Sequence, residues 1–295
     1  MSEFLKIKGY QVIGIRRRST QETECPPVEI IEGDILDSGF LREVVREIEP
    51  DEFYHLAAMS HVGESFRIPS ATLQTNILGT LNCLEAVRET GCKFYQASTS
   101  ELFGDSPPPQ DETSPMSPRS PYAISKLAAY WLVRNWRERG LYAVNGILYN
   151  HESPRRGADF VTQKVCTAAA EIKAGMRKSL KLGNLEVRRD WGHAEDYVRG
   201  MWLMMQQPGP DDYVLATGES RSVKDLLNAA FGCVGLHWGN YVVPDRALYR
   251  PTEVEHLKGN PAKAEALGWT RKWTFQTMIE EMVDAAAGRI NFRHR

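Results

Sequence analysis

The first half of the chain alternates short apolar runs rich in β-forming residues with longer stretches of helical periodicity. This alternation is typical of βαβ units, in which parallel strands are joined by crossover helices. We therefore predict an α/β fold built on a doubly wound parallel sheet. The expected strands are 10–15, 28–31, 53–57, 93–98 and 142–148, and the expected helices are 2–8, 40–48, 71–90 and 121–139.

The regular alternation loosens after residue 150, where loops precede a terminal helix expected at 274–287. A nucleotide-binding domain over residues 1–150 is the simplest interpretation of the first part. Residues 151–295 are expected to form mainly a smaller substrate-binding part, with some segments returning to the first domain. A chain of 295 residues is long enough for both.

Composition excludes several classes of protein. The 36 Lys and Arg residues nearly balance 38 Asp and Glu, which argues against a general binder of nucleic acid or of acidic membranes. No apolar run approaches the roughly 18 residues of a membrane span. Five cysteines, an odd number with no Cys-x-x-Cys, suggest neither a disulfide framework nor a metal site. A reducing, cytoplasmic setting is the expectation that follows.

One group of side chains has the composition and spacing of a catalytic site. Ser98, Thr99, Ser100 and Glu101 end an expected strand, and a Tyr-x-x-x-Lys pattern opens the helix that follows, with Tyr122 and Lys126 on one face. An ammonium group beside a phenol lowers the pKa of the phenol, so the phenolate can serve as a base. A strand-end hydroxyl could share a substrate hydroxyl with that tyrosine.

With these residues the chain resembles the extended short-chain dehydrogenase/reductase family and, within it, the GDP-mannose 4,6-dehydratases. The resemblance runs from about residue 3 to about residue 285. It rests on four stretches, Gln96 to Gly104, Pro118 to Ala123, Asn150 to Gly157 and Arg189 to Tyr197. It implies a Rossmann-like fold, a homodimer or homotetramer, and conversion of GDP-mannose to GDP-4-dehydro-6-deoxymannose and water in deoxysugar biosynthesis.

The resemblance assigns roles to the strand end and the helix. Thr99, Glu101 and Tyr122 match the catalytic trio, and Lys126 both tunes the tyrosine and binds the cofactor. Tyr122 would take the proton of the sugar 4-hydroxyl while NADP oxidises C4, and the resulting ketone acidifies C5. Glu101 would then remove the C5 proton while the 6-hydroxyl leaves as water. Simple epimerases and reductases of this fold need no such base.

The choice of NADP over NAD can be argued from the residues after the first expected strand. Arg16, Arg17, Arg18 and Ser19 stand where NAD-specific proteins place an acidic residue for the ribose, and arginines there favour a 2′-phosphate. Further cofactor contacts are implied by matching family positions. Together with Arg17, Arg18, Ser19 and Lys126 they are Asp34, Ile35, Leu56, Ala57, Ala58, Ser60, His151 and Arg156.

Substrate contacts are also carried over from the family. An arginine can grip a diphosphate, and a carboxylate can bond ribose hydroxyls or guanine donors. Beside Thr99, Glu101 and Tyr122, the matching positions are Asn150, Lys164, Arg189, Arg250 and Glu253.

The glycine-rich turn of a dinucleotide site is missing from this pattern. Such a turn lies between the first strand and first helix, where the backbone approaches the pyrophosphate. The first glycine here is Gly9, already beyond the first expected helix. Relative to the family, roughly twenty residues with a central strand are expected to be absent. Either the start is truncated or the protein is naturally shortened, and we expect this chain to bind NADP weakly.

Two alternatives stay open on sequence alone. A related nucleotide-sugar reductase or epimerase would share most of these residues, although Glu101 favours the dehydratase. A non-catalytic nucleotide-sugar-binding homologue would keep the pocket without the cofactor turn.

Overall fold

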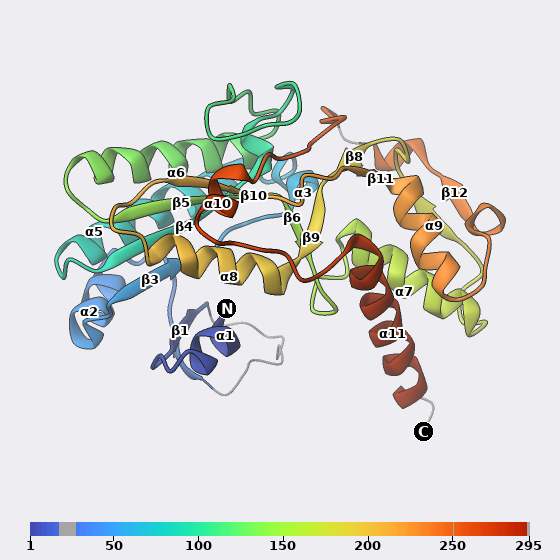
Figure 1. Ribbon diagram of the computed structural model, residues 1–295, viewed down its shortest axis with the longest axis horizontal. Helices are drawn as coiled ribbons and strands as arrows, with labels where there is room; N and C mark the ends of the chain where they lie inside the picture. The colour runs from blue at the N-terminus through green and yellow to red at the C-terminus, as the bar shows by residue number, and fades with distance from the viewer. Residues whose placement is uncertain (18–27, 250, 294–295) are drawn as a thin grey trace. The chain divides into compact units, whose positions relative to one another are not determined.

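The computed structural model describes residues 1–17, 28–249 and 251–293 (Figure 1). The chain divides into two compact units, each with its own hydrophobic core. Unit 1 comprises Met1–Leu102, Pro118–Ile147 and Val198–Tyr213. Unit 2 comprises Phe103–Ser117, Leu148–Tyr197 and Val214–Arg295. Each unit is thus assembled from segments far apart in the sequence.

Unit 1 is built on a four-stranded sheet in the order β10-β5-β4-β3. Strands β3 and β4 are parallel, with Glu52 opposite Lys93. Every residue of β5 is buried, as expected for a strand covered on both faces. These strands confirm the predicted α/β class. The ends of β3, β4 and β5 lie within two residues of the expected ones, whereas β10 was not predicted. Their bounds are β3 Glu52–His55, β4 Lys93–Thr99, β5 Ala143–Leu148 and β10 Asp212–Leu215.

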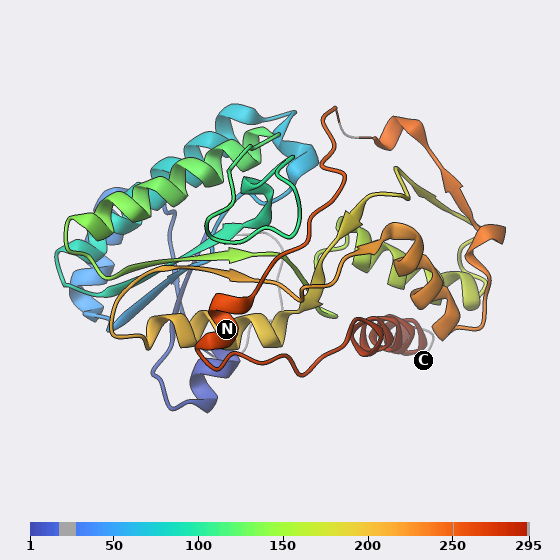
Figure 2. The ribbon, with the colours of Figure 1, turned by 45° about the horizontal axis from the view of Figure 1, so that its top comes forward.

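Helices cover this sheet. Figures 1 and 2 show α6 (Pro121–Glu138) along one side of β4 and β5 and α8 (Ala194–Met205) along the other. Helix α2 (Ser38–Ile48) packs against α5 (Gly79–Arg88) with Leu41 and Val45, one turn apart on its buried face. Together α2, α5, α6 and β4 enclose the core of unit 1.

A separate two-stranded sheet precedes this core in the chain. Strands β1 (Ile13–Arg16) and β2 (Glu29–Glu32) are parallel, and among the described residues they pair with no strand of the four-stranded sheet. Helix α1 (Ser2–Ile7) packs against α8, where Phe4 meets the Trp202 ring edge-on at 6.1 Å. Trp202 also donates to the Tyr10 hydroxyl at 2.9 Å. Strand β1 therefore begins three residues later than predicted.

The helix expected at 71–90 is present and contains a π-helical turn. It consists of α4 (Pro69–Leu73), the π-helical turn η1 (Gln74–Leu78) and α5. The wider turn contains Asn76, whose buried side chain bonds outside the helix to Met59 and Ser125. Hydrophobic periodicity alone could not reveal the π-helical turn, because the apolar face of the helix continues through it.

Helices and several short strands make up unit 2. Helices α7 (Val161–Lys173), α9 (Val223–Cys233) and α11 (Phe275–Arg293) pack against one another, and Figure 2 views α11 nearly end-on. Ser222 begins α9 with a capping box shared with Asp225. The remaining elements are α3 Val62–Ser65 and η2 Ser100–Leu102 in unit 1, and β6 Asn150–Glu152, β7 Leu180–Leu182, β8 Arg188–Arg189, β9 Trp191–His193, β11 Arg221–Ser222, η3 Trp238–Asn240, β12 Val242–Pro244, η4 Arg246–Leu248 and α10 Ala262–Ala266 in unit 2.

None of the helices described here is both long and apolar enough to cross a membrane.

Candidate active site

The carboxyl end of β4 carries two of the predicted catalytic residues. Thr99 is the last residue of the strand, and Glu101 lies in the 3-10 turn η2 that follows. The Thr99 hydroxyl accepts a hydrogen bond from the Glu101 main-chain N–H at 3.3 Å. Thr99 is buried, whereas Glu101 is partly exposed, so its carboxylate can reach a ligand. The local turn thus presents both side chains at one end of the sheet.

The start of α6 positions Tyr122. Ser120 caps the helix by accepting from the Ala123 N–H at 3.1 Å, and Pro121 occupies the first helical position. The N–H of Tyr122 would otherwise lack a partner, and it donates to the buried Ser65 hydroxyl of α3 at 3.2 Å. Ser65 was not expected from the sequence, because this bond spans 57 positions.

Lys126 lies one turn beyond Tyr122 on α6 and is 4% exposed. Its ammonium makes no hydrogen bond or ion pair with any residue in the described part of the chain, and desolvation lowers the pKa of Lys126 to about 8. The nearby His55 is also buried, and burial lowers its pKa to about 3, so it is neutral at pH 7. Lys126 is therefore a buried cation without a counter-ion among the described residues.

Asn76 links the loop after β3 to the catalytic helix. Its side chain accepts from the Met59 N–H at 2.8 Å and donates to the Met59 carbonyl at 3.1 Å. It also donates to the Ser125 hydroxyl at 2.8 Å, which in turn donates to the Tyr122 carbonyl. A polar asparagine within a helix expected to be largely buried could have indicated this role, but Asn76 was not predicted as a site residue. The network holds the 56–60 loop in register with Tyr122.

Two predicted substrate residues meet in unit 2. Arg189 of β8 is 6% exposed and donates to the Glu253 carboxylate at 3.0 Å. It also donates to the Val254 carbonyl at 2.7 Å. The neighbouring Arg188 holds the next residues, since its main chain bonds to Glu255 and Leu257. Arg189 therefore clamps the segment that carries Glu253.

Asp190 organises the same region from the other side. Its carboxylate accepts from the Thr217 N–H at 2.7 Å, the Thr217 hydroxyl at 2.6 Å and the Gly218 N–H at 2.9 Å. A longer bond of 3.3 Å joins it to the Gly259 N–H. Burial raises the pKa of Asp190 to about 6 against these four donors. Asp190 belongs to the Arg189–Tyr197 stretch, but it was not predicted as a site residue.

Two other predicted substrate residues, Lys164 and Asn150, lie in unit 2. Lys164 of α7 lines a cavity of about 450 Å³, whose wall also includes Thr167, Glu171 and Arg177 but neither Arg189 nor Glu253. Asn150 begins β6, opposite Trp191 of β9. Arg250 lies outside the described residues. The substrate role of each stays a prediction.

Comparison with known proteins decides the family. The model of the GDP-mannose 4,6 dehydratase family matches residues 1–282. GDP-mannose 4,6 dehydratase 1 of Arabidopsis thaliana is 49% identical over 306 residues, covering 96% of this chain and 85% of that protein. The human GDP-mannose 4,6 dehydratase is 44% identical, covering 97% of this chain and 87% of its own length. The chain belongs to the GDP-mannose 4,6-dehydratase family.

Solved structures agree with the fold expected of this family. The UDP-glucose 4-epimerase of Thermus thermophilus, in complex with NAD, superposes with a TM-score of 0.88 at 28% identity and covers 97% of this chain and 94% of its own. RMD from Pseudomonas aeruginosa, complexed with NADPH, gives 0.80 at 26% identity, with 90% and 92% covered. These neighbours confirm the predicted Rossmann-like class, and both were solved with a nicotinamide nucleotide.

The family's cofactor positions in unit 1 fall on loops at strand ends. Arg17 follows β1 and is exposed, whereas Arg18 and Ser19 lie outside the described residues. After β2, Asp34 accepts from the Leu36 N–H at 3.0 Å, and Ile35 packs so closely on Gly79 that a Cβ there would lie 2.4 Å from its Cδ1. After β3, Leu56, Ala57 and Ser60 are exposed and Ala58 is partly buried.

Two further residues predicted to contact the cofactor lie in unit 2. His151 of β6 bonds through Nδ1 to the Tyr149 carbonyl at 2.9 Å. Arg156 pairs with the buried Glu152 at 3.1 Å, and its guanidinium lies 3.6 Å from the centre of the Phe160 ring. Arg156 therefore has protein partners already, and its cofactor role stays a prediction.

Unpartnered polar atoms test whether unit 1 suits a nicotinamide nucleotide. The Ser98 hydroxyl is buried near the end of β4 and has no partner within the described residues. The Lys126 ammonium likewise has no hydrogen-bond partner in the part of the chain that the structure describes. A ligand rich in hydroxyl groups would satisfy both, so these residues fit the ribose and carboxamide of a nicotinamide nucleotide.

Proposed function

We propose that this chain is a hydro-lyase that converts GDP-α-D-mannose to GDP-4-dehydro-6-deoxy-D-mannose and water. Membership of the GDP-mannose 4,6-dehydratase family supports the substrate and the reaction. The observation that carries the chemistry is Glu101, a partly exposed carboxylate anchored through its main chain to Thr99. Only a dehydratase of this fold needs a base in that place.

NADP is the cofactor we propose, with Arg17, Arg18 and Ser19 as the residues that prefer its 2′-phosphate. Lys126, Asp34, Ile35 and the 56–60 loop would hold its remaining parts in unit 1, and His151 and Arg156 in unit 2. When bound, the nicotinamide would accept a hydride from C4 of the sugar and return it to C6. The first 150 residues would mainly serve the cofactor and the rest mainly the sugar nucleotide.

Tyr122 and Lys126 perform the first proton transfer. The buried Lys126 charge has no counter-ion among the described residues, so it favours the Tyr122 phenolate more strongly than a solvated lysine could. The phenolate accepts the proton of the sugar 4-hydroxyl, and the Thr99 hydroxyl orients that group. The product is a carbonyl at C4, which makes the C5 proton acidic.

Glu101 performs the elimination. Its carboxylate takes the C5 proton, and the electron pair of that C–H bond forms the C5–C6 double bond. The C6–O bond breaks as the 6-hydroxyl accepts a proton and leaves as water. One carboxylate can serve both transfers, because the two reacting carbons are adjacent. C5 regains a proton as C6 is reduced, which balances the proton that Tyr122 took from the 4-hydroxyl.

Substrate binding falls to unit 2 in this proposal. Arg189 supplies the buried cation for a diphosphate, and Glu253 beside it supplies acceptors for ribose or guanine donors. Asn150, Lys164 and Arg250 complete the predicted set.

Mass spectrometry after incubation with GDP-mannose and NADP⁺ tests the proposal. A dehydratase yields a product lighter by one water molecule, an epimerase yields an isomer of unchanged mass, and a binding protein yields no product. Glu101→Gln serves as the matched control, because it keeps the shape of the site and removes the base. Persistent absence of water loss with saturating cofactor would exclude the dehydratase.

We also propose a homodimer or homotetramer in a reducing cytoplasm. Leu78, Ile124 and Trp131 are apolar side chains of η1 and α6 that are 46%, 49% and 54% exposed, which supports self-association through this face. Four cysteines are free, and the fifth, Cys25, lies outside the described residues.

A further inference from the structure

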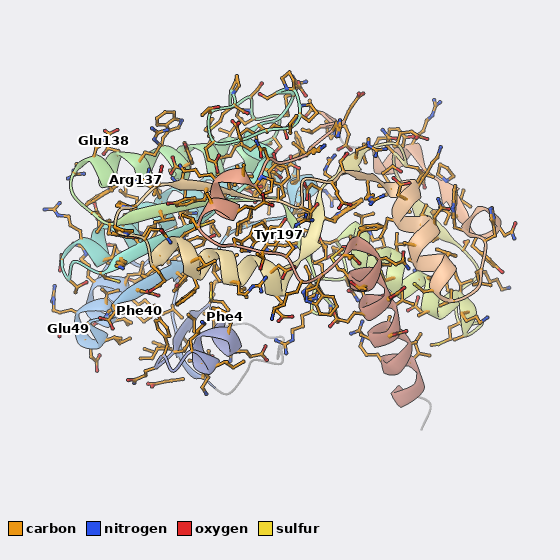
Figure 3. The ribbon with its side chains drawn as sticks, in the orientation of Figure 1. Phe4, Phe40, Glu49, Arg137, Glu138 and Tyr197 are labelled. Atoms are coloured by element: carbon orange, nitrogen blue, oxygen red, sulfur yellow. The ribbon has the colours of Figure 1, made fainter. Side chains whose placement is uncertain are left out.

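The motif from Arg189 to Tyr197 contains an aromatic contact that the proposed reaction does not use. Strands β6 and β9 are parallel, with His151 opposite Gly192. The ring of Tyr197, labelled in Figure 3, stacks on the His151 imidazole with centroids 5.0 Å apart and planes inclined by 23°. A Cβ on Gly192 would lie 2.5 Å from Tyr197 Cε2. Glycine is therefore required at 192 for the Tyr197 ring to reach His151.

The Tyr197 ring is fixed on its other side as well. Trp269 meets it edge-on, with centroids 6.1 Å apart and planes at 89°. Trp269 is itself held, because its indole N–H donates to the Asp196 carbonyl at 2.8 Å. Tyr197 is fully buried, yet its hydroxyl has no partner among the described residues. The packing thus depends on the ring and not on the hydroxyl.

Hydrogen bonding defines the tautomer of His151. Its Nδ1 lies 2.9 Å from the Tyr149 carbonyl oxygen, which can only accept, so Nδ1 carries the proton. The lone pair is then on Nε2, which bonds to no residue in the described ranges. Burial lowers the pKa of His151 to about 4, and Arg156 acts in the same direction. At neutral pH this side chain presents an acceptor and no charge.

We propose that Tyr197 is a positioning residue that fixes His151 as an uncharged hydrogen-bond acceptor for an N–H or O–H group of the bound ligand. A protonated histidine would attract a phosphate, whereas an Nε2 lone pair repels phosphate oxygens. His151 therefore selects the donor groups of the cofactor or the sugar. The ligand part rests on the proposed function, but the tautomer does not.

The tautomer is tested first, on the ligand-free chain. Nitrogen-15 NMR of the histidine side chains separates a protonated Nδ1 from a protonated Nε2 and follows the charge with pH. We expect a His151 signal with the proton on Nδ1 that stays neutral down to about pH 5. A proton on Nε2, or a charged ring at pH 7, would overturn the proposal whatever the enzyme does.

Two substitutions isolate the ring of Tyr197. Tyr197→Phe keeps the stack and removes only the unpartnered hydroxyl, so the NMR signature should persist. Tyr197→Leu removes the stack, and we expect the single tautomer to become a mixture. A persistent single tautomer in Tyr197→Leu, or its loss in Tyr197→Phe, would contradict the positioning role. Circular dichroism identifies any variant that fails to fold. If Tyr197→Leu does not fold, Gly192→Ala takes its place, because an alanine Cβ at 192 displaces the Tyr197 ring while keeping the tyrosine.

Calorimetric titrations with NADP⁺ and with GDP-mannose identify the ligand group. Tyr197→Leu should weaken the affinity for one of these two ligands about tenfold, equivalent to roughly 1.4 kcal/mol. Tyr197→Phe should bind that ligand as tightly as the wild type. His151→Gln, which retains an acceptor, should bind that ligand more tightly than His151→Leu. Equal affinities across these variants for a ligand that does bind would refute the ligand contact. Binding of neither ligand to the wild type would instead count against the proposed function and leave the NMR result standing.

Discussion

Lys126 is a charged side chain in a buried position, where water cannot solvate its ammonium group. Its charge is buried without a counter-ion among the described residues, and its pKa falls from the ordinary 10.5 to about 8. A pKa lowered in the folded state means that burying the charge costs stability below pH 8. The cost diminishes between pH 8 and 10.5, where the folded protein has released the proton and the unfolded chain still binds it.

Lys126→Met should therefore stabilise the ligand-free protein. A shift from 10.5 to about 8 corresponds to a gain on the order of 3 kcal/mol at pH 7, with dehydratase activity lost. Chemical denaturation at pH 7 and at pH 10 measures the gain, which should be smaller at the higher pH. A variant less stable than the wild type at pH 7 would show that an unseen partner neutralises Lys126.

Glu101→Gln should abolish water loss and leave binding of GDP-mannose unchanged within about twofold, because the amide keeps the shape of the side chain but cannot accept the C5 proton. Turnover is measured by mass spectrometry and binding by calorimetry. Normal turnover in this variant would exclude Glu101 as the base.

Helical spacing was enough to place Tyr122 and Lys126 on one face of a helix, and a strand end was enough to group Thr99 with Glu101. The roles of Ser65 and Asn76 could not be predicted from the sequence, because their hydrogen bonds join residues 57 and 49 positions apart. The direct pairing of Arg189 with Glu253 was likewise unforeseen, although both residues were named.

At the scale of elements, the segment that carries Glu253 depends on β8 and its flanking residue Asp190. Asp190→Asn replaces one acceptor oxygen by a donor, so it cannot satisfy Thr217, Gly218 and Gly259 together. We expect a loss of about 2–4 kcal/mol in the free energy of unfolding and a KM for GDP-mannose that rises more than kcat falls. Thermal denaturation and steady-state kinetics measure the two effects.

Glu219→Gln is the matched control for Asp190→Asn. Its carboxylate pairs with Arg221 on the surface, where both side chains are about half exposed, so the expected change is below about 0.5 kcal/mol. Equal effects of the two substitutions would show that Asp190 has no special role in holding the 253–259 segment.

Element types followed from the sequence more reliably than their continuity. Strands β3, β4 and β5 were predicted as apolar runs, whereas β10 was not predicted. The π turn at Asn76 was not predicted either, since such a turn leaves the composition of the helix unchanged. Asp37 and Ser120 mark where α2 and α6 begin, and each accepts a main-chain hydrogen bond there.

At the scale of the whole molecule, the two hydrophobic cores belong to different units. In unit 1 the buried Asp212 accepts from Arg137 of α6 at 2.6 Å, from Tyr130 at 2.8 Å and from Asn145 at 2.9 Å (Figure 3 labels Arg137). This carboxylate ties α6 to β5 and β10.

Asp212→Ala removes the acceptor that these three side chains share, and should cost about 3–5 kcal/mol. Hydrogen exchange measured by mass spectrometry should then rise in α6 and β5 while α7, α9 and α11 keep their protection. A uniform rise across both units would show that the chain unfolds as one cooperative body.

The edge of the four-stranded sheet has a consequence for how this protein is handled. Among the described residues β3 pairs only with β4, and β1 only with β2, so each presents a row of main-chain donors and acceptors along one side. Such edges can pair with extended segments of other molecules. Because a strand added to such an edge presents a new edge in turn, pairing of this kind can continue from molecule to molecule. We therefore expect concentrated preparations to gain intermolecular β-structure more readily than dilute ones.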